Sequence, residues 1–168
     1  EVRKSVILSA RALIEKEPAY SYVTARLLLH TIRFEVLGEE VIQQEMVSRY
    51  ADYFPSFIKR GIDAELLDAR MAQFDLSRLA KILDATRDLK FGYLGLQTLY
   101  DRYFLHVQDQ RIELPQAFFM RVAMGLALKE DEPESRAIEF YNMLSTMRFT
   151  SATPTLFNSA TNHPQLSS

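Results

Sequence analysis

The residues best suited to chemistry gather at the end of the chain, in TSATPTLFNSATNHPQLSS, residues 150–168. No Lys, Arg, Asp or Glu follows Arg148, although 25% of the whole chain is charged. Hydroxyls, amides and loop N–H groups bind phosphate and sugar oxygens without a charge, provided that the loop is held rigid. Pro154 and Pro164 would supply that rigidity, because a proline ring fixes φ. Three apolar residues would hold the loop against an apolar surface: Leu156, Phe157 and Leu166. From the residues alone, however, a linker to a further domain is the stronger interpretation.

The rest of the chain offers no catalytic or metal-ligating set. Its three histidines, His30, His106 and His163, fall in different elements, and no pair has the spacing of a metal site. The motif Glu-x-x-His, which a dimetal carboxylate bundle would need, does not occur. There is no cysteine, no glycine-rich phosphate loop and no G-x-S-x-G turn. We therefore expect no catalytic residue, no metal site and no cofactor within these residues.

Composition and charge narrow the class of protein. The 168 residues are 48% hydrophobic with a formal net charge of −2, which is typical of one globular domain or one layer of a larger protein. No run of more than two Lys or Arg occurs, so nothing marks a surface for nucleic acid or an anionic membrane. Aromatic residues gather in residues 100–119 without basic neighbours, which favours a packed core over a base-stacking surface. The chain begins without Met, and we expect it to be part of something longer.

The hydrophobic period predicts a mainly α fold of several helices with one short β-hairpin. Gly38 is placed to cap one helix, and Pro55 to follow the end of another. The hairpin is expected at about residues 103–114 and must lie on helices, because isolated hairpins are marginal in water. The expected helices span residues 3–18, 19–38, 39–54, 56–60, 63–74, 76–85, 94–103, 114–129 and 133–149. We divide the chain into a helical domain, residues 1–148, and an irregular loop, residues 149–168.

The end of the chain closely resembles one stretch of a known enzyme family. TPTLFNSATNHPQLSS is similar to the sequence that opens the catalytic barrel in the large subunit of class I ribonucleotide reductases. The family pattern runs Thr-Pro-Thr-Leu-Phe-Asn, one or two small residues, Thr-Asn, a variable residue, Pro-Gln-Leu-Ser-Ser and then cysteine. The chain departs from it mildly at Ser159, Ala160 and His163. Upstream, FGYLGLQTLYDRYFL, ELPQAFFMRVAMGLAL and AIEFYNMLSTMRF also resemble the family, so the likeness runs from about Phe91 to Ser168.

The resemblance implies roles for two residues. Thr153 would contact a nucleoside diphosphate substrate, and Ser168 would help to bind it, so that residues 149–168 form a substrate-wall loop. The redox cysteine would follow directly after Ser168, and the loop would lead into a ten-stranded α/β barrel. We therefore expect these residues alone to be inactive.

The resemblance also implies the setting of the whole protein. It would reduce ribonucleoside diphosphates to deoxyribonucleotides by thiyl-radical chemistry, in the cytoplasm. A small subunit with a metal-radical cofactor would be its partner, and the large subunit would self-associate. Thioredoxin or glutaredoxin would serve as reductant, and ATP and deoxynucleotides as effectors.

Two alternatives stay open at this point. One is a cobalamin-dependent class II reductase, whose members share a looser form of the terminal pattern. The other is a non-catalytic helical interaction module that keeps reductase ancestry. The module predicts an ordered segment after Thr150, whereas a fragment of a larger barrel predicts a mobile one, because its supporting strands are missing.

Overall fold

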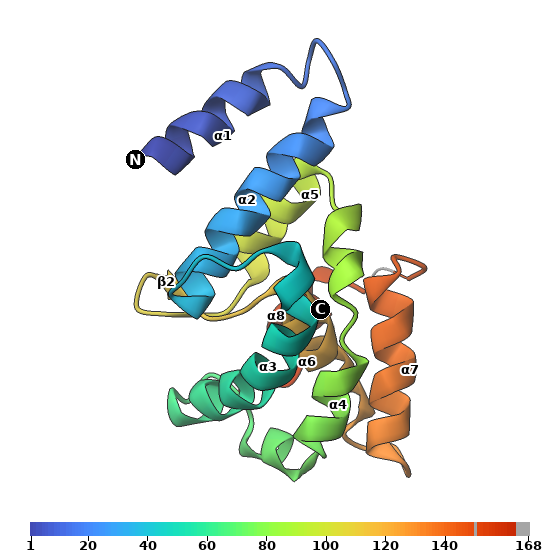
Figure 1. The fold of residues 1–168 in the computed structure, drawn as a ribbon. Coiled ribbons are helices and arrows are strands. Elements are labelled where there is room, and N and C mark those ends of the chain that lie inside the picture. Colours follow the sequence, from blue (N-terminus) through green and yellow to red (C-terminus); the bar gives the residue numbers. More distant parts are fainter. Residues whose placement is uncertain (150, 164–168) are drawn as a thin grey trace.

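The computed structural model describes residues 1–149 and 151–163, and it is built from helices around one central helix (Figure 1). In chain order, the α-helices are α1 (Val2–Ala12), α2 (Tyr20–Leu37), α3 (Met46–Asp63), α4 (Leu76–Ile82), α5 (Tyr93–Thr98), α6 (Pro115–Ala127), α7 (Pro133–Ser145) and α8 (Thr153–Asn158). Three short 3₁₀-helices are η1 (Gln43–Glu45), η2 (Ala69–Gln73) and η3 (Ala85–Lys90), and η4 (Leu99–Tyr103) is a π-helix. The strands are β1 (His106–Val107) and β2 (Gln110–Arg111). The mainly α class with one small hairpin is confirmed.

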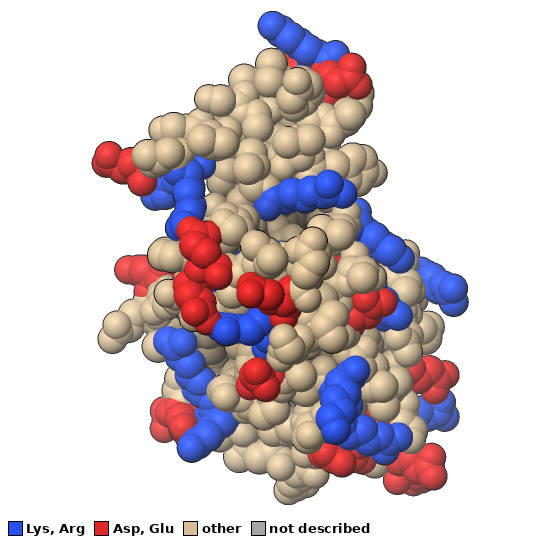
Figure 2. Space-filling model, in the orientation of Figure 1, with Lys and Arg blue, Asp and Glu red and all other residues tan. Residues whose placement is uncertain are grey.

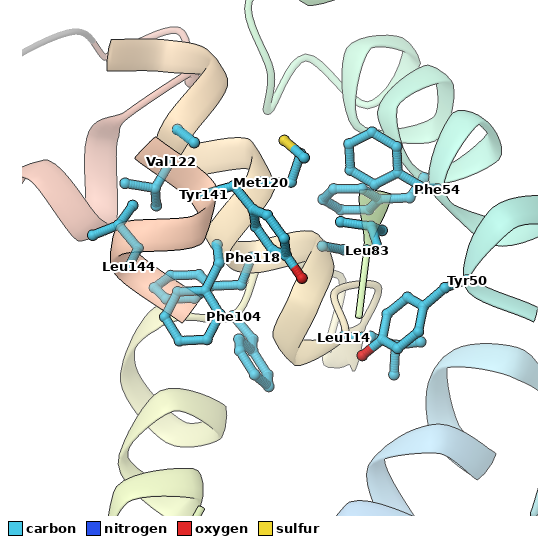
Figure 3. Close-up of a cluster of buried hydrophobic side chains, with 14 of the residues drawn as sticks. Tyr50, Phe54, Leu83, Phe104, Leu114, Phe118, Met120, Val122, Tyr141 and Leu144 are labelled. Atoms are coloured by element: carbon cyan, nitrogen blue, oxygen red, sulfur yellow. The ribbon is translucent and has the colours of Figure 1, made fainter. Parts of the chain in front are cut away.

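Helix α6 is the centre of the fold. All of its residues are buried except Gly125 and Leu126, so it is surrounded by other elements rather than lying on a surface. Its closest companion is α7, and Figure 3 shows Phe118, Met120 and Val122 in a cluster that side chains from the surrounding elements complete. By contrast, Figure 1 shows α1 beside α2 at the end of the molecule farthest from α4.

Helix α2 ends where the sequence indicates. Gly38 has φ 78°, a left-handed conformation that glycine adopts without strain, and its N–H donates to the Phe34 carbonyl at 2.9 Å. Helix α1 ends earlier than expected, at Ala12 rather than near Pro18. Its last turn tightens, with the Leu13 N–H donating to the Ala10 carbonyl three residues back, as helix ends commonly do.

The prediction that a helix ends before Pro55 is wrong, because α3 runs through it from Met46 to Asp63. Proline removes one backbone hydrogen bond from a helix interior, a local cost. Apolar residues at helical spacing continue on both sides of it and are buried along one face: Met46, Tyr50, Phe54, Phe57 and Ile58. Burial of that face outweighs the lost hydrogen bond.

The helix expected over residues 63–74 is also wrong for its first half. Glu65 has φ 58°, which turns the chain out of α3, and only Ala69–Gln73 are helical, as the 3₁₀-helix η2. Asp68 caps that helix by accepting a hydrogen bond from the Arg70 N–H at 2.9 Å.

The hairpin is confirmed but is shorter than residues 103–114. Its register pairs His106 with Arg111 and Val107 with Gln110, and the preceding residues belong to the π-helix η4. As expected, it lies on a helix: the Arg111 N–H donates to Glu35 Oε1 of α2 at 2.9 Å.

The prediction of an irregular loop over residues 149–168 is wrong for Thr153–Asn158, which form helix α8. Pro154 stands in the first turn of this helix, where its fixed φ suits the geometry and its missing N–H costs nothing. The proline expected to stiffen a loop thus helps to start a helix.

A buried polar network crosses the apolar core. Asp88 accepts hydrogen bonds from Arg33 at 3.0 Å, Tyr50 at 2.8 Å and Gln116 at 2.7 Å. The Tyr141 hydroxyl donates to the Gln116 amide oxygen at 2.7 Å, and Figure 3 shows Tyr50 and Tyr141 entering the cluster from opposite sides. This network joins α2, α3, η3, α6 and α7.

The surface seen in Figure 2 mixes both signs of charge without a patch of one sign. This agrees with the formal net charge of −2. Among the described residues, none of the helices combines the length and the apolar run that a bilayer span requires.

Candidate functional site

The candidate site is built by the terminal segment, residues 151–163, where it lies against α6. Gly125 permits this contact, because a Cβ at that position would overlap Ser159 Oγ and the backbone nitrogen of Ala160. Ser159 also donates through Oγ to the Val122 carbonyl of α6 at 2.7 Å. Both Ser159 and Ala160 are buried, so the contact is a packed interface.

A fully buried ion pair hydrogen-bonds to the backbone of the segment. The side chains of Glu113 and Arg121 are both 0% exposed, and Arg121 Nε donates to Glu113 Oε1 at 2.7 Å. The same guanidinium donates to the Ser159 carbonyl at 2.9 Å and reaches the Leu156 carbonyl at 3.5 Å. Glu113 Oε2 accepts the Leu105 N–H at 2.9 Å, which brings in the start of the hairpin. Burial raises the pKa of the Glu113 carboxyl, and the charge of Arg121 opposes that rise.

The far end of the segment is fixed to the turn after α3. The Asp68 N–H donates to the Ala160 carbonyl at 2.9 Å, and Leu67 forms an isolated antiparallel bridge with Thr161. Asn162 Nδ2 donates to the Glu65 carbonyl at 2.6 Å. The segment is therefore anchored from Leu156 to Asn162, which is the opposite of what a loop without support would show.

Thr153, the predicted substrate contact, begins α8 and is exposed. Its Oγ1 lies 3.4 Å from the Tyr103 hydroxyl, at the long limit of a hydrogen bond. Phe157 stacks on Tyr103 with ring centroids 4.6 Å apart, and Leu156 packs against the core as expected. The Thr153 hydroxyl thus stands open to solvent beside an aromatic pair. Ser168, with Pro164 and Leu166, lies outside the described residues.

Comparisons with known proteins decide the family. Residues 89–164 match the family model for the ribonucleotide reductase all-alpha domain. The whole chain is 51% identical to the ribonucleoside-diphosphate reductase subunit alpha of Chlamydia trachomatis and 38% identical to that of Helicobacter pylori. Over 91% of its length it is 37% identical to the ribonucleoside-diphosphate reductase large subunit of Danio rerio.

The chain belongs to the ribonucleotide reductase family. It spans 16% to 21% of the length of these three relatives. The matched residues 89–164 coincide with the stretch that carries the sequence resemblance, and the whole-chain matches extend the likeness to α1–α4, where the sequence alone has no diagnostic motif.

Sequence reasoning missed the residues that border residues 151–163 and hold them in place. Tyr103 was assigned to packed core, whereas it also borders Thr153. Arg121 carried a signal, because it is one charge inside the apolar run AFFMRVAMGLAL, and such a charge needs a buried partner. Nothing in the sequence marked Glu113 as the partner of Arg121, since the two side chains come together only in the folded chain.

The arrangement suits binding rather than bond breaking. Among residues 1–149 and 151–163, no three His, Cys, Asp or Glu side chains come together to hold a metal ion. His30 pairs instead with Glu40 at the surface. A cavity of about 350 Å³ between α6, α7 and the start of the segment has an almost wholly apolar lining, which does not suit a diphosphate. Thr153 is one of the polar residues that the segment exposes to solvent, together with Asn162 and His163.

Proposed function

We propose that the chain is part of the large subunit of a class I ribonucleoside-diphosphate reductase, and that its terminal segment forms one wall of the substrate site. The observation that carries the proposal is the combination of an exposed Thr153 with a backbone that is anchored directly after its helix, from Ser159 to Asn162. The names of the relatives, subunit alpha and large subunit, support an assembly of two kinds of subunit and so favour class I over class II. The division into a helical domain, residues 1–148, and a substrate-wall loop, residues 149–168, is part of the proposal.

Within this function, the residues of this chain bind and position the substrate. Thr153 donates its hydroxyl to an oxygen of the nucleoside diphosphate, and Ser168 adds a second contact. A metal-radical cofactor held by a partner small subunit would supply the one-electron oxidation of a cysteine outside these residues to a thiyl radical. A cysteine pair, also outside them, reduces the ribose and is restored by thioredoxin or glutaredoxin. These residues by themselves are inactive.

The setting of the whole protein is proposed on the same grounds. ATP and deoxynucleotides act as effectors, the large subunit self-associates, and the protein works in the cytoplasm. None of these properties depends on the residues described above, so each needs its own measurement.

A second candidate function has one observation in its favour. A non-catalytic helical module requires the segment after Thr150 to be ordered, and residues 151–163 pack against α6 and the turn after α3. A test of reductase activity, described next, separates the two functions.

The test uses the protein at its natural length with its small subunit and a cytidine diphosphate substrate. We expect deoxycytidine diphosphate to form, and Thr153→Val to raise the KM about tenfold or more, because a hydrogen bond to a charged group contributes about 1.5–3 kcal/mol. Thr98→Val is the matched control, since the Thr98 hydroxyl donates to the Leu94 carbonyl within its own helix α5. Absence of reduction would favour the helical module, and equal effects of the two substitutions would remove Thr153 from the site.

A further inference from the structure

We propose that Glu113 and Arg121 are positioning residues of the substrate site: the ion pair sets the place of α8, and through it the place of the Thr153 hydroxyl. This inference rests on the proposed function. Neither residue reaches the exposed face where Thr153 lies, because both side chains are 0% exposed. Their effect on a substrate must therefore pass through the backbone that they hold.

Arg121 acts on the C-terminal end of α8. The last carbonyls of a helix lack partners within the helix, and a cation near them is favourable. The Arg121 guanidinium donates to the carbonyl of Leu156 in the last turn and to that of Ser159, the residue directly after the helix. It therefore satisfies two carbonyls where α8 would otherwise fray.

The short length of α8 carries this restraint to Thr153. The helix has 6 residues, so its two ends are only about 9 Å apart. Thr153 stands at the first position and Ser159 follows the last, and a helix of fewer than two turns moves as a unit. A shift at the Arg121 end is then a shift of the Thr153 hydroxyl, and a misplacement of about 1 Å is enough to weaken a positioned contact.

Glu113 fixes the direction in which Arg121 points. It accepts from Arg121 Nε at 2.7 Å and from the Leu105 N–H at 2.9 Å, so the carboxylate is itself tied to the hairpin. Well-packed apolar residues often stabilise a core as well as a buried ion pair does. The charged pair instead fixes the orientation of the Arg121 hydrogen bonds, because the N–H donors of a guanidinium lie in a rigid planar arrangement.

The second buried pair supplies a matched control. Arg33 and Asp88 are nearly as buried as Arg121 and Glu113, with side chains 5% and 0% exposed, and Arg33 Nη2 lies 3.0 Å from Asp88 Oδ2. The hydrogen bonds of Arg33 go to Gln43 and Asp88, so the pair makes no hydrogen bond to the terminal segment. Loss of Arg33 tests general damage to the core, whereas loss of Arg121 tests the place of α8.

The experiment compares Arg121→Met with Arg33→Met in the natural-length protein with its small subunit. Two kinds of measurement are made. One is amide hydrogen exchange along the chain, and the other is steady-state kinetics with cytidine diphosphate, which gives KM and kcat. We expect Arg121→Met to lose protection in residues 156–163 and to raise KM about tenfold, with a smaller change in kcat. Arg33→Met should lose protection in α2 and leave KM within about twofold of the wild-type value.

Two further variants keep the inference testable if Arg121→Met does not fold. Arg121→Lys keeps the charge but loses the fork of donors, so we expect a KM between those of Arg121→Met and wild type. Gly125→Ala displaces the segment without removing a charge, because its Cβ would overlap Ser159 and Ala160. We expect it to raise KM as well.

The outcomes separate this inference from the proposed function. If the wild type is active and Arg121→Met raises KM no more than Arg33→Met does, the positioning role is overturned while the proposed function stands. Unchanged exchange in residues 156–163 of Arg121→Met would overturn it too. A wild type without reductase activity would overturn the proposed function and this role together.

Discussion

Two arginines lie inside the helical core, each against a carboxylate from another element. Arg33 of α2 meets Asp88 of η3, and Arg121 of α6 meets Glu113 before it. Burial raises the pKa of the Asp88 carboxyl, and the charge of Arg33 and the hydrogen bonds of Gln116 and Tyr50 oppose the rise. Removing one member of such a pair leaves the other charge buried without compensation, which costs more than the pair contributes.

The first residue-scale prediction concerns Asp88. We expect Asp88→Ala to lower the free energy of unfolding by about 3–5 kcal/mol, because Arg33, Tyr50 and Gln116 all lose their acceptor. Urea denaturation followed by circular dichroism measures the change. Asp52→Ala, at an exposed position on α3, is the control and should stay within about 0.5 kcal/mol of the wild type. A loss below 1 kcal/mol for Asp88→Ala would mean that the core around Arg33 admits water.

At the scale of elements, α3 shows how packing can override a local signal. Local rules end a helix before Pro55, yet α3 continues to Asp63 because Phe57 and Ile58 are buried beyond the proline. The helix therefore keeps a local cost at Pro55, which the burial of its apolar face outweighs but does not remove. Such a cost is a target for a stabilising substitution.

We expect Pro55→Ala to raise the free energy of unfolding by about 1–2 kcal/mol. Alanine restores the backbone donor and avoids a proline penalty of about 3 kcal/mol in a helix interior, and the greater freedom of the unfolded chain takes back about 1 kcal/mol. Ser56→Ala, the exposed neighbour on the same helix, is the control. Thermal and urea unfolding should agree on the ranking. A destabilised Pro55→Ala would show that packing of the proline ring stabilises the fold more than the restored hydrogen bond does.

At the scale of the whole molecule, the sequence predicts what is periodic or local. The period of apolar residues places α2, α6 and α7, and Gly38 marks the end of α2. The failures are places where distant residues decide. The turn at Glu65 is held by Asn162, nearly a hundred positions away, and no local pattern encodes that contact.

In the candidate site, too, some residues can be singled out from the sequence and others only from the fold. A motif with a family likeness is enough to single out Thr153, which the structure places on an exposed helix start. The ion pair beneath it joins Glu113 to Arg121 and then to the Ser159 carbonyl, a backbone atom that carries no side-chain signal. A sequence motif can therefore propose a substrate contact such as Thr153, whereas the residues that we propose hold it in place are found only from the fold.

The last prediction concerns the stability of the whole fold in alkali. Burial raises the pKa of the Tyr141 hydroxyl to about 12 and that of Tyr100 to about 12, against about 10 in an unfolded chain. Between pH 10 and pH 12 the unfolded chain has lost these protons while the folded chain still binds them. The free energy of unfolding therefore falls as pH rises through this window, and the stabilisation is complete below pH 10.

Urea unfolding at several pH values from 9 to 11.5 measures this slope. We expect Tyr141→Phe to make it shallower by up to about 1.4 kcal/mol per pH unit, since one proton no longer titrates. Leu144→Ala is the control: it removes buried methyl groups next to Tyr141 and lowers stability at every pH without removing a phenol, so its slope should match the wild type. An unchanged slope for Tyr141→Phe would mean that the Tyr141 hydroxyl ionises equally readily in the folded and unfolded chain, and that its hydrogen bond to Gln116 does not hold the proton.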